Sequence, residues 1–320
     1  MDYVIAGNVM IDVVRFSDGT SSNRSHIGGP ATFAYSGVRV WTDSVIQVSN
    51  VGEDYHTIFD PWIEKNGVIT DGLKVKCDFS NHSYLVYSED GTYHSDQTVE
   101  HFRSDWFQDF GYLKTTPEEI GRFTQGQNVK GIYLAQNCDS VYWRKLKEMK
   151  QRDGFKVMWE IEEPSSYKKF MPLVLNAMES VDVFSINLNE AKTLFNVKSE
   201  EDCIEHLKRL PVDMTLFRVG KKGLYTICGH KAYFLPSAPT DIEKDPTGCG
   251  NTSTGSALYA YCEGKDAIMV GIMANVASGI NIRQFGVIPD FAEVRGFALK
   301  QAEQLYAEYR DKAQWQNIGG

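Results

Sequence analysis

The stretch that decides the fold is Asp245-Pro246-Thr247-Gly248-Cys249-Gly250-Asn251-Thr252-Ser253-Thr254-Gly255. Two glycines flank a single residue directly before a run with helical spacing of apolar residues, which Gly264 is expected to end. The pattern predicts a glycine turn that opens a helix. The backbone N–H groups of such a turn, added to those of a helix N-terminus, form a site for an anion. A tight turn without a ligand would have the same spacing.

Two common phosphate-binding motifs do not describe this stretch. A Walker A loop ends in Gly-Lys-Ser or Gly-Lys-Thr, and that ending is missing here. A dinucleotide fingerprint follows the first strand of a chain and reads GxGxxG, which is not found after Tyr3-Val4-Ile5-Ala6. The stretch is then either a tight turn alone or an anion site that could stabilise charge on a transferring phosphoryl group.

A second glycine pair opens another helical run, Gly28-Gly29-Pro30-Ala31-Thr32-Phe33-Ala34. Small residues at the start of a helix allow a ligand or another backbone to come close. The sequence leaves both explanations open.

Outside these stretches, strand-like runs alternate with helical ones. The strands are expected at 3–6, 45–48, 131–135, 155–161, 181–186 and 214–219, and helices at 56–66, closed by Gly67, and from the cap Asp139 to 153. Helices are also expected over 265–284, stopped by Gly286, and after a capping box at 290–293. Such alternation predicts one α/β domain over residues 1–320, a doubly wound, mostly parallel sheet flanked by helices.

One region, approximately residues 77–102, interrupts this alternation. Asp90-Gly91 stands between β-prone segments rich in tyrosine, which predicts a hairpin. We expect a small β lid inserted here, which residues 12–27 could join. A peripheral hairpin without a role in function is the alternative.

Composition excludes several classes of protein. The chain has 320 residues, of which 42% are apolar, and 33 Lys and Arg against 42 Asp and Glu give a net charge of −9. These values are typical of a globular protein and argue against nucleic-acid or membrane partners. The six cysteines are scattered without a CxxC pair, and the N-terminus lacks the pattern of a signal peptide, so we expect a cytoplasmic protein.

Taken together, these segments resemble the ribokinase-like sugar kinases of the phosphofructokinase B type over nearly the whole chain. Gly28-Gly29 matches the family's N-terminal signature, and Asp245 to Gly250 matches its C-terminal signature, usually Asp-Thr-Thr-Gly-Ala-Gly-Asp. The order of the shorter matches agrees: Gly7-Asn8 with Asp12, Val51-Gly52-Glu53-Asp54, Asn187-Leu188-Asn189-Glu190, Gly220-Lys221-Lys222-Gly223 and Ala274-Asn275.

The resemblance implies a role for each matching position, with ATP and Mg²⁺ as cofactors. Asp12 would hold sugar hydroxyls, Gly28, Gly29 and Phe33 would lie beside the substrate, and Gly248, Cys249 and Gly250 would form the anion hole. Glu190 would lie near magnesium, and Asn187, Gly220, Gly223 and Asn275 near the nucleotide. Two simpler roles stay open: Asn187 could cap the helix that contains Glu190, and Asn275 could be a polar residue of the core.

Two positions depart from the family pattern. The family's catalytic base is the Asp that ends the C-terminal signature, and here that position is Asn251. A carboxamide cannot accept the substrate's proton, although it can orient the hydroxyl group, and Asp245 is the nearest spare carboxylate. Phe33 stands where the family usually has Asn, so this position would offer a ring face or a core residue in place of a hydrogen bond.

The expected function is an ATP-dependent kinase that phosphorylates a hydroxyl of a sugar or nucleoside-like small molecule. Asn251 leaves open a slow kinase, a kinase with a displaced base, or a catalytically impaired protein that binds nucleotide or sugar as a sensor or partner subunit. An oxidoreductase is disfavoured by the missing fingerprint. Because lids of the resembled family pair between subunits, a homodimer through the lid is a further expectation.

Overall fold

A computed structural model describes residues 1–22, 24–89, 93–95 and 113–312. Within these residues, nine strands form the central sheet in the order β13-β12-β11-β10-β9-β8-β1-β4-β5. The strands are β1 (Tyr3–Ala6), β4 (Val45–Gly52), β5 (Leu73–Cys77), β8 (Gly131–Gln136), β9 (Lys156–Ile161), β10 (Val183–Asn187), β11 (Met214–Arg218), β12 (Gly223–Cys228) and β13 (Lys231–Pro236). All pairs from β11 to β5 are parallel, and β12 and β13 add an antiparallel edge.

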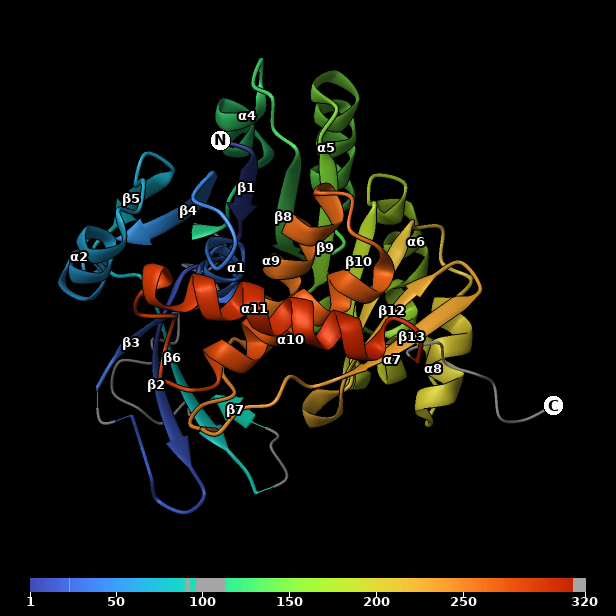
Figure 1. The fold of residues 1–320 in the computed structure, drawn as a ribbon. Coiled ribbons are helices and arrows are strands. Elements are labelled where there is room, and N and C mark those ends of the chain that lie inside the picture. Colours follow the sequence, from blue (N-terminus) through green and yellow to red (C-terminus); the bar gives the residue numbers. More distant parts are fainter. Residues whose placement is uncertain (23, 90–92, 96–112, 313–320) are drawn as a thin grey trace.

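Helices cover both faces of this sheet, as the alternating pattern predicts (Figure 1). One apolar cluster joins the sheet to α1 (Pro30–Arg39), α2 (Tyr55–Asn66), α9 (Cys249–Cys262), α10 (Ala267–Asn281) and α11 (Phe291–Tyr309). A second joins the other face to α4 (Pro117–Thr124), α5 (Ser140–Asp153), α6 (Met171–Met178), α7 (Leu188–Phe195) and α8 (Glu200–Leu207). The fold class is therefore confirmed. Among the described helices, none has both the length and the apolar character of a membrane span.

Most helix ends follow the predicted signals. The Asp139 carboxylate accepts a hydrogen bond from the Tyr142 amide, and Gly154 and Gly67 end α5 and α2 in the left-handed conformation. Two details differ. α10 ends at Asn281, before the predicted residue 284. Asp290 caps α11 through the amides of Ala292 and Glu293, while the reciprocal bond of a capping box is not seen among the described residues.

A second, smaller sheet lies apart from the first, at the lower left of Figure 1. Its order is β3 (His26–Gly28), β2 (Met10–Phe16), β6 (Asn81–Tyr87) and β7 (Tyr93–Ser95). The predicted hairpin is present, since β6 and β7 pair antiparallel with Tyr87 opposite Tyr93. Residues 90–92 and 96–102 of the predicted lid lie outside the described residues, and Cys77 ends β5 in the large sheet.

The two helices that the glycine motifs open pack directly on each other. A Cβ on Gly255 of α9 would lie 2.0 Å from the Ala34 carbonyl oxygen of α1. A Cβ on Gly37 of α1 would lie 2.0 Å from the Thr252 carbonyl oxygen of α9. Because only glycine allows this approach, the crossing fixes the N-termini of both helices relative to one another.

Candidate functional site

A cavity of about 290 Å³ lies where the small sheet meets the carboxyl ends of the central strands and the start of α9. Its wall combines residues that are far apart in sequence: Met10, Asp12, Gly29, Pro30, Phe33, Ser83, Leu85, Tyr87, Glu160, Asn187, Glu190, Arg218, Pro246, Thr247, Gly248, Gly250 and Asn251. The carboxyl edge of a parallel sheet is where α/β proteins bind ligands.

The glycine turn before α9 forms one side of this cavity. Gly248 is the N-cap residue with φ 74°, a conformation that favours glycine. The amides of the first helical turn have no intrahelical acceptor and carry the positive end of the helix dipole. Gly248 and Gly250 therefore give the wall a surface suited to an anion.

Cys249, between these glycines, turns its side chain away from the cavity. Its Sγ lies 3.6 Å from the Ser278 carbonyl oxygen in α10, and its amide donates to the Pro246 carbonyl at 3.2 Å. Burial raises the pKa of the thiol to about 11. Cys249 thus supports the turn, and its thiol is not part of the cavity wall.

Asn251 follows the turn and lines the cavity. Its Nδ2 donates to the Tyr133 hydroxyl at 3.4 Å, and that hydroxyl donates to Oε2 of Glu160 at 2.7 Å. Burial raises the pKa of Tyr133 well above its usual range, so the phenol keeps its proton. The carboxamide is thereby oriented by a neutral tyrosine that is itself held by a carboxylate.

A buried ion pair faces the same turn. Glu160 is the next-to-last residue of β9 and Arg218 ends β11, and Nη1 of Arg218 lies 2.7 Å from Oε1 of Glu160. Nη2 of Arg218 lies 3.9 Å from Oε2 of Glu190. A Cβ on Gly250 would lie 2.0 Å from Nη1 of Arg218, so the guanidinium packs directly on the first turn of α9.

Asn187 and Glu190 form a reciprocal capping box at the start of α7. The Asn187 side chain accepts from the Glu190 amide at 3.0 Å, and Glu190 accepts from the Asn187 amide at 2.9 Å. Burial raises the pKa of Glu190 to about 7, against the opposing charge of Arg218. The simpler role left open for Asn187 is thus seen, and both residues also line the cavity.

Asp12 lies on the opposite side, on β2 of the small sheet. It is 3% exposed, and its Oδ1 has no hydrogen-bond partner among the described residues. Burial, reinforced by the charge of Asp245, raises its pKa to about 7, although the Gly29 amide donates to the carboxylate. A Cβ on Gly28 would lie 1.7 Å from its Oδ2, which explains the first glycine of the pair. A buried acceptor facing a cavity is suited to a ligand hydroxyl.

Phe33 is a core residue that also borders the cavity. It is 2% exposed, and a Cβ on Gly248 would lie 2.2 Å from its ring. The ring therefore packs against the glycine turn. This packing agrees with the core alternative for Phe33 more closely than with a free ring face.

Three predicted nucleotide-binding residues are not part of this cavity wall. Asn275 donates its amide hydrogens to the carbonyls of Leu235 and Pro236, at 3.0 and 2.8 Å, so it joins α10 to β13. Gly223 has φ 128°, and a Cβ there would lie 2.1 Å from the Leu235 carbonyl oxygen. Gly220, with φ 66°, opens the short helix η3 (Gly220–Lys222).

A second cavity of about 600 Å³ borders the first and shares Tyr87 and Pro246 with it. Lys221, Lys244 and Asp245 lie on its wall. Asp245 is 1% exposed, accepts the Thr247 amide at 2.9 Å, and has a pKa raised by burial. The volume is in the range of cofactor sites.

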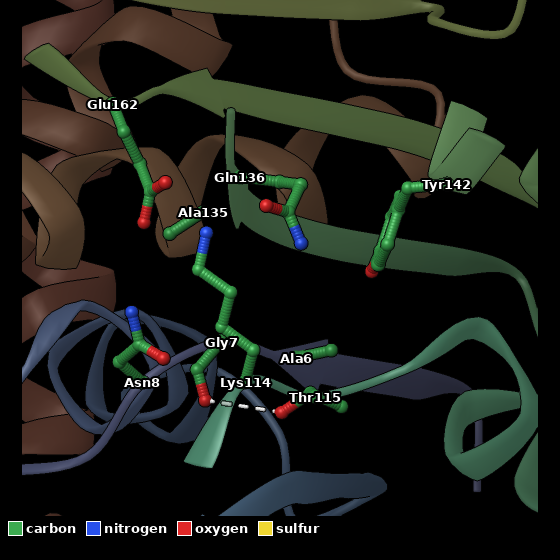
Figure 2. Close-up of a pocket in the computed structure, with 9 residues that line it drawn as sticks. All are labelled: Ala6, Gly7, Asn8, Lys114, Thr115, Ala135, Gln136, Tyr142 and Glu162. Atoms are coloured by element: carbon green, nitrogen blue, oxygen red, sulfur yellow. Dashed lines mark hydrogen bonds between the residues drawn. The ribbon is translucent and has the colours of Figure 1, made fainter. Parts of the chain in front are cut away.

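A third cavity, at the ends of β1 and β8, is too small for a substrate. Figure 2 shows the Lys114 amine directed toward Glu162, with Asn8 and Gln136 beside them. Its volume of about 10 Å³ accommodates about one water molecule. Burial raises the pKa of Glu162, and the charge of Lys114 opposes that rise.

Sequence reasoning missed several residues of the main cavity wall, among them Tyr87, Glu160 and Arg218. It also missed Tyr133, which lies outside the wall and bonds to Glu160 and Asn251. Tyr87 shares a hydrogen bond of 2.9 Å with the Thr247 hydroxyl, which joins the small sheet to the segment before α9. For Glu160 and Arg218 a signal exists, since each is a charged residue near the end of an apolar strand-like run. Opposite charges in two such runs predict a buried pair if the strands lie close together.

The carboxylates present suit a magnesium ion that is held mainly by phosphates. Among the described residues, no group of three or more His, Cys, Asp or Glu side chains forms a metal cage. Mg²⁺ is usually bound by one or two carboxylates together with substrate phosphates and water. Glu190, half-buried and on the wall of the same cavity as the glycine turn, meets that requirement.

Comparison with known proteins agrees with the fold. The model of the pfkB family of carbohydrate kinases matches residues 2–293. An uncharacterized protein of Schizosaccharomyces pombe is 23% identical over 97% of this chain and 92% of its own. A nucleoside kinase of Burkholderia thailandensis in complex with inosine has a TM-score of 0.73 at 14% identity, over 95% of this chain and 98% of its own. An Arabidopsis thaliana ribokinase complexed with ribose and ATP has a TM-score of 0.68 at 18% identity, over 94% of this chain and 98% of its own. The ribokinase-like fold is thereby confirmed.

Proposed function

The chain belongs to the pfkB family of carbohydrate kinases, and from that membership we propose that it transfers the terminal phosphoryl group of ATP to a hydroxyl group of a sugar or nucleoside-like substrate. The observation that carries the proposal is the placement of two unlike groups in one cavity. The buried acceptor Asp12 faces it from the small sheet, and the glycine-opened start of α9 faces it from the other side.

Each side of the cavity suits one reactant. Asp12, as a carboxylate, accepts hydrogen bonds from substrate hydroxyls. The first-turn amides of α9 stabilise the charge on the phosphoryl oxygens while the bond from phosphorus to the substrate oxygen forms and the bond to ADP breaks. Asn251 orients the attacking hydroxyl by hydrogen bonding. Since catalysis of phosphoryl transfer depends mostly on positioning and charge stabilisation, these groups can act without a base at position 251, at a reduced rate.

The nucleotide is proposed to occupy the adjoining cavity of about 600 Å³, where Lys221 and Lys244 are available to its phosphates. Glu190, on the wall of the main cavity, would hold Mg²⁺. The ion would neutralise charge on the phosphates when bound.

A second candidate function, favoured by Asn251, is a protein that binds nucleotide or sugar without turnover. The carboxamide cannot accept the substrate's proton, and general-base help is typically worth ~10²–10⁴-fold in rate. A sensor or partner subunit would keep the binding groups and lack catalysis.

ADP release distinguishes the two. The purified protein would be incubated with ATP, Mg²⁺ and a panel of sugars and nucleosides, and binding of each compound measured by calorimetry in parallel. Substrate-dependent ADP release that Asp12→Asn abolishes supports the kinase. Binding of ATP and of a panel compound without any ADP release supports the non-catalytic protein, and absence of ATP binding contradicts both.

A further inference from the structure

Arg218 is the one cation among the described residues that line the main cavity. It occupies an unusual position, because its guanidinium packs on the first turn of α9, where a Cβ on Gly250 would lie 2.0 Å from Nη1. The N-terminus of a helix carries partial positive charge, so a cation is unfavourable there unless an anion lies beside it. Glu160, 2.7 Å from Nη1, is such an anion, and it holds the guanidinium against the helix N-terminus at one end of the cavity.

We propose, on the basis of the proposed function, that Arg218 binds the terminal phosphoryl group of ATP together with the first-turn amides of α9, and that Glu160 is the positioning residue for its guanidinium. Neither residue belongs to the motifs from which the kinase resemblance was drawn. Arg218 would add a fixed charge to a site where the backbone supplies only dipoles.

The donor geometry of Arg218 leaves capacity for such a ligand. Nη1 is bound to Glu160 at 2.7 Å, while Nη2 lies 3.9 Å from Glu190, longer than a hydrogen bond. Nε is without a partner among the described residues. Guanidinium groups present five N–H donors in a planar fork, which matches the oxygens of a phosphoryl group.

A purely structural role accounts poorly for the pair. Buried ion pairs contribute little net stability, because removing two charges from water costs about as much as their attraction returns. An ion pair that only stabilises the fold does not have to line a cavity. Here both residues are on the cavity wall, and the Arg218 side chain is 13% exposed. Tyr133 donates to the second oxygen of Glu160, which fixes the carboxylate and through it the arginine.

The position along the cavity favours ATP over an anionic acceptor as the source of the phosphoryl group. Arg218 packs on Gly250, at the anion end, whereas Asp12 packs on Gly28, at the opposite side. A phosphate or carboxylate carried by the acceptor would have to reach past the acceptor's own hydroxyls. We therefore commit to the nucleotide, and the alternative source is an outcome of the test.

The test compares ATP, ADP and adenosine by calorimetry on the full chain with Mg²⁺ and without an acceptor, so that no turnover is needed. Arg218→Met combined with Glu160→Gln removes both charges together and avoids an unpaired buried glutamate. We expect this double variant to bind ATP roughly 10- to 100-fold more weakly. The affinities for ADP and adenosine should change by less than about threefold, since neither reaches the anion end.

Two single variants separate charge from geometry. Arg218→Lys keeps the positive charge and loses the planar set of guanidinium donors. Its affinity for ATP should lie between those of the wild type and the double variant. Glu160→Gln keeps the arginine, and should lower the ratio of ATP to ADP affinity less than the double variant does.

The outcomes are distinguishable. An unchanged ratio of ATP to ADP affinity in the folded double variant, or in Arg218→Lys should the double variant not fold, overturns the role of Arg218 while the kinase proposal stands. In a separate calorimetry series, the sugars and nucleosides of the panel are titrated into the same variants without ATP. Loss of binding of a panel compound with unchanged ATP affinity assigns Arg218 to an anionic acceptor and also overturns the proposal. Absence of ATP binding to the wild type overturns the proposed function itself.

Discussion

In the proposed kinase, Asn251 is the residue on which the rate would depend most directly. Replacing it with Asp would supply a base, and we expect Asn251→Asp to raise ADP release on the true substrate by up to ~10²-fold. Asp cannot donate to the Tyr133 hydroxyl as Nδ2 of Asn251 does at 3.4 Å, so a long hydrogen bond is lost. The free energy of unfolding should therefore change by no more than about 1 kcal/mol.

The control for this variant is Asn251→Ala, which removes both the base and the orienting amide and should lower the rate. If Asn251→Asp is no faster than the wild type on any compound of the panel while ATP still binds, the missing base does not limit the rate. The non-catalytic function would then be favoured.

Asp12 makes stability and ligand binding depend on pH in opposite directions. Its pKa in the folded chain is about 7, raised from 3.8 mainly by burial. The folded state therefore keeps the proton where the unfolded state has lost it, so the free energy of unfolding falls as the pH rises from about 4 to about 7. The loss is at most about 4 kcal/mol, since one unit of pKa corresponds to about 1.4 kcal/mol. Substrate affinity should rise over the same range, as the ionised carboxylate becomes available.

Urea unfolding at pH 5 and pH 8 measures this effect against Asp12→Asn. Glu190 also has a raised pKa and contributes equally to both proteins. Asp245 acts on Asp12 through its charge, so the difference between the two proteins includes that coupling. The stability of Asp12→Asn relative to the wild type should increase between the two pH values. If the difference in the free energy of unfolding between Asp12→Asn and the wild type is the same at pH 5 and pH 8, Asp12 does not titrate in this range.

Glu190 should control the effect of magnesium on nucleotide binding. Glu190→Gln keeps an oxygen for the Asn187 amide, which Glu190 accepts at 2.9 Å, so the cap of α7 survives. The charge that would face the metal is lost. We expect ATP affinity to become insensitive to Mg²⁺ in calorimetry.

The matched control is Glu119→Gln, because Thr116 and Glu119 form the same reciprocal box at α4, away from the main cavity. It should leave the magnesium effect intact. An unchanged magnesium effect in Glu190→Gln would remove Glu190 from the metal site.

The sequence allowed some site residues to be predicted and others not. Asp12, Gly248 and Asn251 belong to short local motifs, and all three line the cavity. Glu160 and Arg218 are separated by 57 residues and meet only because β10 alone stands between their strands. Strand order is a property of the whole sheet, so local patterns could not pair them.

At the scale of elements, the crossing of α1 and α9 holds the site together. Gly255→Ala would place a Cβ 2.0 Å from the Ala34 carbonyl oxygen, which forces the helices apart and shifts the glycine turn. We expect urea unfolding to show a loss of about 2 kcal/mol or more, together with weaker ATP binding.

Gly296→Ala is the control, since nothing lies within 4 Å of a Cβ at that position of α11. Alanine favours a helix interior over glycine by roughly 0.5–1 kcal/mol, so this variant should be more stable than the wild type. Equal stability of the two variants would mean that the crossing tolerates a methyl group.

Element prediction succeeded where the signal was local. Asp139 and Gly154 bound α5 as predicted, because capping depends on residues within one turn. The antiparallel strands β12 and β13 were not assigned. They run from Gly223 to Pro236 and alternate less regularly between buried and exposed residues, and their pairing at the sheet edge is a tertiary feature.

At the scale of the whole molecule, the small sheet joins two distant segments. β2 and β6 pair in parallel with Asp12 opposite Ser83, although 70 residues separate them. The hairpin of β6 and β7 could be predicted from Asp90-Gly91, whereas the parallel pairing leaves no local signal. Because both strands of that pair line the cavity, a ligand there contacts the two sheets at once.

Ligand binding should therefore protect the small sheet from hydrogen exchange. Asp12 and Ser83 lie on adjacent strands of the small sheet and line the cavity. Without ligand, Tyr87 of the same sheet already shares a hydrogen bond of 2.9 Å with Thr247, in the segment before α9. With ATP, Mg²⁺ and a bound substrate, opening of this sheet must break ligand contacts as well, so amides over 10–16, 84–89 and 93–95 should exchange more slowly. The remote strand β13, over 231–236, should exchange at an unchanged rate and serves as the internal control.

Tyr87→Phe removes one link between the sheets, so its small sheet should exchange faster without ligand and regain protection when ligand binds. Unchanged exchange over 84–89 and 93–95, in a sample that calorimetry shows to be saturated, would mean that the small sheet is not a lid over the substrate.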